Sequence, residues 1–226
     1  MAILAVLGGL LLLALIFGPT LWVRQVLHSA GAERPDLQGT GAELARHLLD
    51  EAGLQDVRVE STTLGDHYDP AARTVRLLPQ HHDGRSIAAV AVAAHEVAHA
   101  VQNAWGEPAF RRRQALVRVL LPLQRAAQVL MIAAPLIFLA SRSPPLLALN
   151  IGFAVILLGG RVAVHAVTLP VEFDASFGKA LPVLQRGGYL PSADMPQARR
   201  VLRAAALTYV AAALLTLVDI ARWFRR

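Results

Sequence analysis

The chain has 226 residues, of which 55% are hydrophobic and 17% are charged, and its mean hydropathy is +0.46. This balance excludes an ordinary soluble globule and predicts a protein of the lipid bilayer. The net charge of +6 comes from arginine, since Lys179 is the only lysine, and many arginines flank apolar runs. Membrane anchoring therefore explains the charge better than nucleic acid, which is not expected as a partner. The absence of cysteine excludes thiolate ligands, so any metal site must use His, Asp or Glu.

Four apolar runs are expected to cross the membrane as helices: Ala2 to Val23, Ala126 to Ala140 extended back to Val119, Leu146 to Val164, and Ala204 to Ile220. The first has no basic segment before it, which favours a retained anchor over a cleaved signal peptide. The prolines at 144 and 145 should stop the helices on either side, so the two middle runs form a helical hairpin. The positive-inside rule then places the large polar segments in the cytoplasm, although Arg222, Arg225 and Arg226 oppose this orientation.

The polar segment after the first run contains both helix and strand patterns. Thr40 and Glu43 form a capping box at the start of a helix that should end near Ala52, before Gly53. Alternation in Val57 to Ser61 and in Thr74 to Leu78 predicts two strands, joined by turn-forming residues and paired as a β-hairpin.

A helix expected from Asp83 to about Asn103 contains the pattern H-E-x-x-H at His95-Glu96-Val97-Ala98-His99. Residues four apart lie one turn above each other, so both imidazoles can bind one ion at ~2.0–2.1 Å. Glu96 lies about 100° around the helix, where it can take a proton from a zinc-bound water that attacks a carbonyl. The alternative is a solvated or satisfied core face, but the apolar surroundings would leave three polar groups unsatisfied unless a metal bound them.

Two histidines require a third protein ligand, with one position left for water. The candidates are His165, Glu172, Asp174, His67, His81 and His82. Glu172 is favoured because it follows Pro170, which suits the first turn of a helix, and because it lies on the same membrane side as His95. Asp174 does not share its helical face, whereas Ser176 does and is expected to orient Glu172 or a histidine. His81 and His82 are expected to be exposed.

Longer blocks surround these residues: Asp66-His67-Tyr68-Asp69-Pro70 with Thr74-Val75-Arg76-Leu77, the run from Gly84 to Gln102, and Leu169-Pro170-Val171-Glu172-Phe173-Asp174-Ala175-Ser176. In these blocks, and in Val201 to Ala213, the chain resembles the bacterial membrane-bound neutral zinc metallopeptidases of the YugP type. Ala98 stands where that family usually has glycine, a departure that adds one methyl and removes no chemistry.

The resemblance implies a zinc-dependent endopeptidase of the bacterial inner membrane that binds one Zn²⁺ per chain and cleaves peptide or protein substrates, including membrane-associated ones. It implies His95 and His99 as ligands, Glu96 as catalytic base and Glu172 as the glutamate ligand of the gluzincin arrangement. By the same analogy, the strand Thr74 to Leu78 offers an edge to an extended substrate. A further transition-state donor is needed, and spacing does not choose among Tyr189, Tyr68, His165 and an arginine.

The expected fold is mainly α: four transmembrane helices with a small α+β zincin-like domain, a β-hairpin plus the H-E-x-x-H helix, at the membrane surface. Its expected parts are a transmembrane anchor at 1–23, a polar zincin-like segment at 24–115, a transmembrane helical hairpin at 116–165, a segment with the third ligand at 166–203, and a transmembrane helix with a basic C-terminus at 204–226.

Two other functions remain open at this point. One is a membrane scaffold or ion-handling protein with a structural metal, which would have no need of Glu96. The other is an intramembrane zinc protease, because residues Ile87 to Ala94 are apolar; that run is far shorter than a membrane span and is followed by Gln102 and Asn103.

Overall fold

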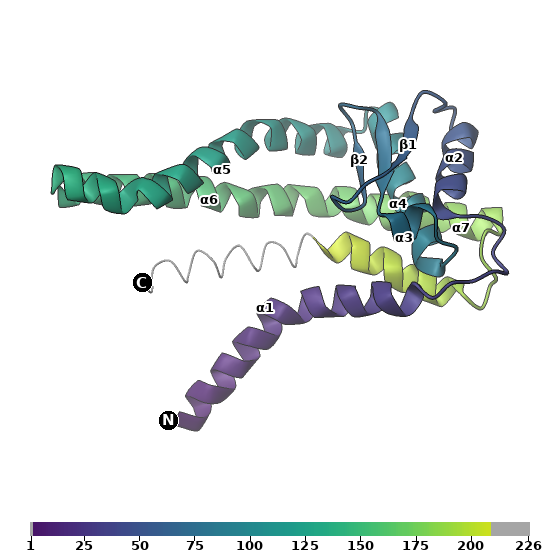
Figure 1. The fold of residues 1–226 in the computed structure, drawn as a ribbon, viewed down its shortest axis with the longest axis horizontal. Coiled ribbons are helices and arrows are strands. Elements are labelled where there is room, and N and C mark those ends of the chain that lie inside the picture. Colours follow the sequence, from purple (N-terminus) through teal and green to yellow (C-terminus); the bar gives the residue numbers. More distant parts are fainter. Residues whose placement is uncertain (1, 209–226) are drawn as a thin grey trace.

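The computed structural model describes residues 2–208, without the side chains of 2–13, 15, 16, 131, 154, 157, 158, 161 and 162. It consists of a compact α+β unit from which the long helices α1, α5 and α6 extend toward the same side (Figure 1). Helix α1 covers Ala2–Ala30, α5 covers Pro108–Ser141 and α6 covers Pro144–Phe173. The α+β unit contains the H-E-x-x-H pattern at residues 95–99.

A three-stranded sheet lies at one side of this unit. Its strands are β1 (Arg58–Ser61), β2 (His67–Asp69) and β3 (Thr74–Leu77), in the order β1-β3-β2. The expected hairpin between the first and last of these strands is wrong, because β1 pairs with β3 in parallel. The reason is β2, a strand in the segment expected to be a turn, which pairs with β3 in the antiparallel sense. Strand β3 is therefore central, and it offers no edge to a substrate.

Helices α2 (Gly41–Glu51), α3 (Pro79–His82) and α4 (Ile87–Ala104) pack against the sheet and against one another. Helix α2 begins with the expected capping box, in which Glu43 N donates to Thr40 Oγ1 and Thr40 N donates to Glu43 Oε2. After α3 comes α4, whose residues 87–100 are all buried. It packs against α2, the sheet and the segment after α6, and is the centre of the hydrophobic core.

The end of α6 is irregular in a way that matters for the site. After Phe173 the helix widens into a π-helical segment, η1 (Asp174–Ala180), which is followed by α7 (Leu181–Gly187). The sequence predicts Pro170 in the first turn of a helix, but this proline lies inside α6. A last helix is described over 195–208. Its buried residues Val201 and Leu202 join the core that contains α4.

The expectation of four transmembrane helices is wrong. Among the residues whose side chains the structure describes, no single helix has both the length and the apolar character needed for a crossing. Two parts of α5, Pro108–Leu130 and Ile132–Ser141, meet these requirements only together, and they are bent by 49°. The ring of a proline inside a helix collides with the carbonyl four residues earlier and bends the helix. For Pro135 this carbonyl belongs to residue 131, which is where the two parts of α5 meet.

The other expected spans also differ from the structure. Among the side chains that the structure describes, the apolar stretch of α6 is Pro144–Phe153, which is shorter than a crossing needs, and α1 contains Pro19. Residues 209–220 of the last expected span, and Arg222, Arg225 and Arg226 after it, lie outside the described residues. Helices α5 and α6 do lie side by side as a hairpin, connected by Arg142 and Ser143 (Figure 1).

Candidate metal centre

Helix α4 brings the two histidines of the H-E-x-x-H pattern together. The helix begins at Ser86, whose side chain accepts a hydrogen bond from Ala89 N at 3.0 Å. From this cap, His95 and His99 fall on one face of the helix, and their ring centroids lie 4.7 Å apart. Both side chains are buried, so their polar atoms must find partners within the protein.

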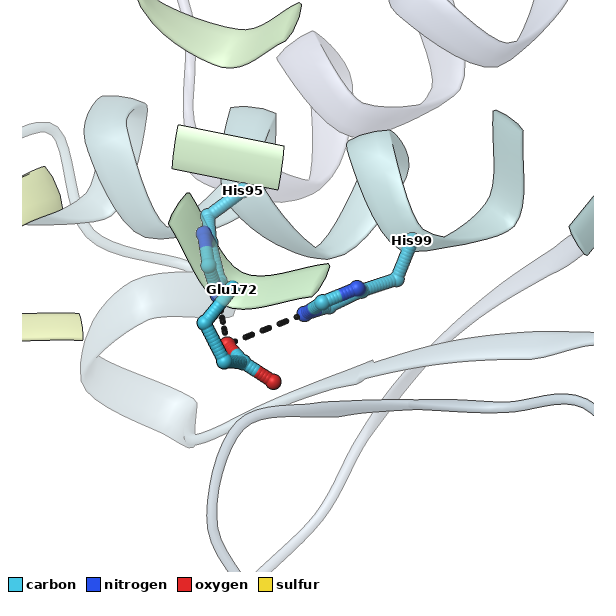
Figure 2. A group of neighbouring side chains, drawn as sticks. All are labelled: His95, His99 and Glu172. Atoms are coloured by element: carbon cyan, nitrogen blue, oxygen red, sulfur yellow. Dashed lines mark hydrogen bonds and ion pairs between the residues drawn. The ribbon is translucent and has the colours of Figure 1, made fainter. Parts of the chain in front are cut away.

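Glu172, in the last turn of α6, supplies the third group. Its Oε2 lies 3.2 Å from His95 Nε2 and 3.3 Å from His99 Nε2 (Figure 2). One ligand atom from each of the three residues lies within 4.8 Å of the others. Ligands ~2.0–2.1 Å from a tetrahedral ion are separated by about 3.3 Å, so these spacings fit a zinc site.

The hydrogen bonds of His95 leave the correct nitrogen available for a metal. Ser176 Oγ donates to the carbonyl of Leu202 at 3.0 Å, and it lies 3.1 Å from His95 Nδ1. Because the hydroxyl proton is already used, Ser176 accepts from Nδ1–H. The neutral ring then has a lone pair on Nε2, which faces Glu172. Ser176 thus contacts His95 on the side of the ring opposite the nitrogen that faces Glu172.

His99 is fixed in the same tautomer by Gln102. Gln102 Nε2 donates to the carbonyl of Val171 at 2.9 Å and to Asp174 Oδ2 at 2.8 Å, which sets the orientation of the amide. Its Oε1, 2.9 Å from His99 Nδ1, can only accept, so Nδ1 carries the proton and Nε2 is bare. Two lone pairs and a carboxylate oxygen therefore face one point, and a divalent cation satisfies all three.

Asp174 supports the centre without facing it. Its carboxylate pairs with Lys179, which also pairs with Glu107 at 2.7 Å. A Cβ at Gly178 would collide with Asp174 Oδ1, so glycine is needed there for this arrangement. Burial opposes ionisation of Asp174, but Lys179 and Gln102 hold the pKa below its ordinary value. The anion is thus kept as an acceptor for Gln102.

The two glutamates of the site have opposite pKa shifts. Burial raises the pKa of Glu96 to about 7, and the nearby charges of Glu172 and Asp66 act in the same direction. Burial also opposes ionisation of Glu172, but His99 and His95 outweigh it and lower its pKa well below the ordinary value. One carboxylate is therefore a permanent anion, and the other has a proton affinity suited to a general base near neutral pH.

A cavity of about 420 Å³ opens onto these residues. The described residues lining it include His95, Glu96, His99 and Glu172, together with Val23 and Leu27 of α1. The cavity therefore combines the polar side chains of the candidate centre with apolar side chains from a distant part of the chain.

Of four further candidates from the sequence, three line the cavity and one does not. His67, Tyr68 and His165 line the same cavity, and Tyr68 OH accepts from Asn103 Nδ2 at 2.9 Å. His67 Nδ1 donates to the carbonyl of Gly65 at 2.7 Å. Tyr189 lies elsewhere, 3.0 Å from His47 Nε2 and 3.2 Å from Glu51 Oε2, and it does not line the cavity.

The expected exposed pair of histidines is only partly exposed. His81 is buried, with Nδ1 2.8 Å from Asp66 Oδ2, while His82 contacts its neighbour Asp83. Neither residue belongs to the group of metal-binding side chains that the described residues form.

Two residues that contact the candidate centre, Gln102 and Arg113, were not singled out from the sequence. Gln102 lies three residues after His99, on a neighbouring helical position, and its place in a buried helix was the available signal. Arg113 Nη2 lies 3.7 Å from Glu172 Oε1. Arg113 lies at the end of the segment expected at 24–115, and its contact with Glu172 could not be read from spacing.

Comparisons with known proteins agree with this geometry. A family model described as “Putative neutral zinc metallopeptidase” matches residues 4–226. The chain is 42% identical over 188 residues to “Putative membrane protease YugP” of Bacillus subtilis strain 168, which covers 81% of this chain and 79% of that protein. No solved structure matches the chain.

Proposed function

The chain belongs to this neutral zinc metallopeptidase family, and we propose that it is a membrane-associated endopeptidase that hydrolyses peptide bonds with one zinc ion per chain. The observation that carries the proposal is the convergence of His95, His99 and Glu172 within coordination spacing, with Glu96 on the next position of the same helix. A structural metal site would use the first three residues and would have no need of Glu96.

The residues divide the chemistry between them. His95, His99 and Glu172 would hold the zinc, which when bound polarises the scissile carbonyl and lowers the pKa of water. Glu96 accepts a proton from the attacking water and passes it to the departing amine. Its raised pKa of about 7 suits both transfers, since the group gains and loses a proton readily near neutral pH.

The cavity supports a peptide with an apolar side chain near the scissile bond. Val23, Leu27 and Val92 form an apolar part of its wall, close to the polar residues that would act on the peptide. Such side chains are common in membrane-associated and unfolded protein segments, which we propose as substrates.

Membrane association is supported by the relative's name and by the helical hairpin. Apolar side chains on α5 and α6 are exposed to an unusual degree, with Ile132 79%, Leu149 70% and Ile156 73% accessible. The described arginines of α5 gather toward the site (Arg111, Arg112, Arg113, Arg118, Arg125), while Arg142 lies at the far tip. This asymmetry favours the cytoplasmic side of a bacterial inner membrane for the site.

The orientation can be tested because the chain has no cysteine. Leu64→Cys places a single thiol at a position that is 87% exposed in the α+β unit. We expect a membrane-impermeant maleimide to label it in inverted vesicles and not in intact cells. Labelling in intact cells would contradict the cytoplasmic placement.

The catalytic proposal is tested by Glu96→Gln, which keeps the shape of the side chain and removes its basicity. We expect one zinc per chain in this variant and casein hydrolysis reduced by ~10²–10⁴-fold. Glu51→Gln is the matched control, since Glu51 contacts Tyr189 away from the cavity. Full zinc content with unchanged hydrolysis in Glu96→Gln would eliminate the mechanism and favour a structural metal site.

The intramembrane alternative has less support. The apolar residues of α4 that motivated it are buried among α2, the sheet and η1, so protein covers them. Their apolar character is explained by the core of the α+β unit.

A further inference from the structure

The two oxygens of Glu172 have different surroundings. Oε2 faces both imidazoles, whereas Oε1 points away from them (Figure 2). Oε1 is buried and has no hydrogen-bond partner among the described residues. The cation facing it is Arg113, whose Nη2 lies 3.7 Å away as an ion pair. A buried carboxylate oxygen without a hydrogen bond is costly, so its environment needs an explanation.

Arg113 is held in place by the packing of α5 against the site. Gly106 allows the sharp turn after α4 through its positive φ of 63°, and Pro108 begins α5. Arg113 follows Phe110 by about one helical turn, and its guanidinium lies over the ring of Phe110, 5.9 Å from the centroid. Phe110 is 1% exposed and its ring centroid lies 6.2 Å from that of His99. Arg113 therefore contacts Glu172 directly, and it is connected to His99 through the ring of Phe110.

A cation at this position is unexpected on simple electrostatic grounds. A guanidinium close to a zinc site repels the ion that the site should bind. Its position is explained if it acts on the carboxylate instead. A carboxylate offers two oxygens to a metal, and a second bond from Glu172 would occupy the position that a catalytic site keeps open.

We propose that Arg113 is a positioning residue of the metal centre: by attracting Oε1, it makes Glu172 a ligand through Oε2 alone. This inference rests on the proposed metal site. Arg113 also lines the cavity, and its side chain is only 16% exposed, so its effect on the carboxylate is weakly screened. The interaction orients a ligand without contacting the metal, which is the role of an outer partner.

The test compares Arg113→Gln with Arg112→Gln, since Arg112 is an exposed neighbour on the same helix. Each protein is loaded with Co²⁺, whose visible absorption is strong in four-coordinate sites and weak in five-coordinate ones. We expect the absorption to fall in Arg113→Gln as Oε1 joins the coordination sphere, and to stay unchanged in Arg112→Gln. We expect kcat for casein hydrolysis to fall ~10–100-fold in Arg113→Gln, with KM little changed.

Arg113→Lys keeps the charge and serves as the second variant. Because the observed contact is an ion pair at 3.7 Å and not a two-pronged hydrogen bond, we expect lysine to restore the wild-type Co²⁺ spectrum. A folded Arg113→Gln protein with the spectrum of the Arg112→Gln control would overturn the proposal. So would an Arg113→Lys protein with the weak absorption expected of the glutamine variant.

The two proposals fail in different ways. A wild-type protein that binds Co²⁺ and never cleaves a peptide would refute the proposed function, while the spectra would still report on Arg113. A protein that cleaves casein with identical spectra in all variants would refute the role of Arg113 alone.

Discussion

Replacing Gln102 with leucine should weaken both zinc binding and the fold. Gln102 is 1% exposed and makes hydrogen bonds with His99, Val171 and Asp174. The substitution leaves His99 Nδ1–H without an acceptor, while Val171 and Asp174 keep other partners. The loss of the three hydrogen bonds of Gln102, with the Nδ1–H of His99 left unsatisfied, should lower the free energy of unfolding by about 2–6 kcal/mol. Burial of leucine returns about 1.5–3 kcal/mol, so a net loss of roughly 2 kcal/mol is expected.

The effect on zinc follows from the tautomer. Without an acceptor at Nδ1, the proton of His99 moves more easily to Nε2, the nitrogen that should bind the metal. We expect zinc affinity to fall ~10–100-fold, measured by competition with a chromophoric chelator, and the unfolding free energy to fall in urea titrations.

Gln102→Glu separates these two effects. A carboxylate still accepts from His99 Nδ1–H, but it donates to neither Val171 nor Asp174 and its charge faces the anion of Asp174. We expect near wild-type zinc affinity with a larger loss of stability than in Gln102→Leu. The reasoning fails if Gln102→Leu binds zinc as tightly as wild type, because the tautomer would then not depend on this amide.

Three further predictions concern other parts of the molecule. Ser176→Ala removes the acceptor for His95 Nδ1–H and should lower zinc affinity ~10–100-fold in the same chelator competition. Leu27→Trp should narrow the cavity and lower kcat/KM for peptides with leucine at the cleavage site more than for those with alanine; equal losses would argue against an apolar subsite there. Hydrogen bonds from Ala72 N and Arg76 lower the pKa of Asp69, so its anion stabilises the fold above about pH 4, and this contribution is lost as the pH falls through the lowered pKa. The difference in Tm between wild type and Asp69→Asn should therefore be present at pH 7 and shrink as the pH falls below about 4, the ordinary pKa of the group.

The two histidines of the candidate centre could be singled out from the sequence because their signal is local. His95 and His99 lie four residues apart on a strongly apolar helix, and Ser176 lies four residues after Glu172. The structure brings Glu172 to the two histidines, although the argument from Pro170 at a helix start was wrong, because Pro170 lies inside α6. The capping box at Thr40 was likewise local, and it is confirmed.

The features that were missed depend on tertiary structure. Residues 67–69 contain turn formers, but they pair with β3, so the sheet forms with β1 parallel and the expected hairpin does not. Apolar composition alone predicted spans that prolines such as Pro135 interrupt. Arg113 gave no signal, because its partner Glu172 lies in another helix.

The most direct test of the metal centre is the zinc content of the purified protein and of Glu172→Ala. Zinc that His95, His99 and Glu172 hold together should be present at one ion per chain in the wild type. It should be lost from Glu172→Ala on dialysis against a weak chelator, while circular dichroism stays that of a folded protein. One tightly held zinc per chain in folded Glu172→Ala would contradict the account, because the ion would then be bound elsewhere.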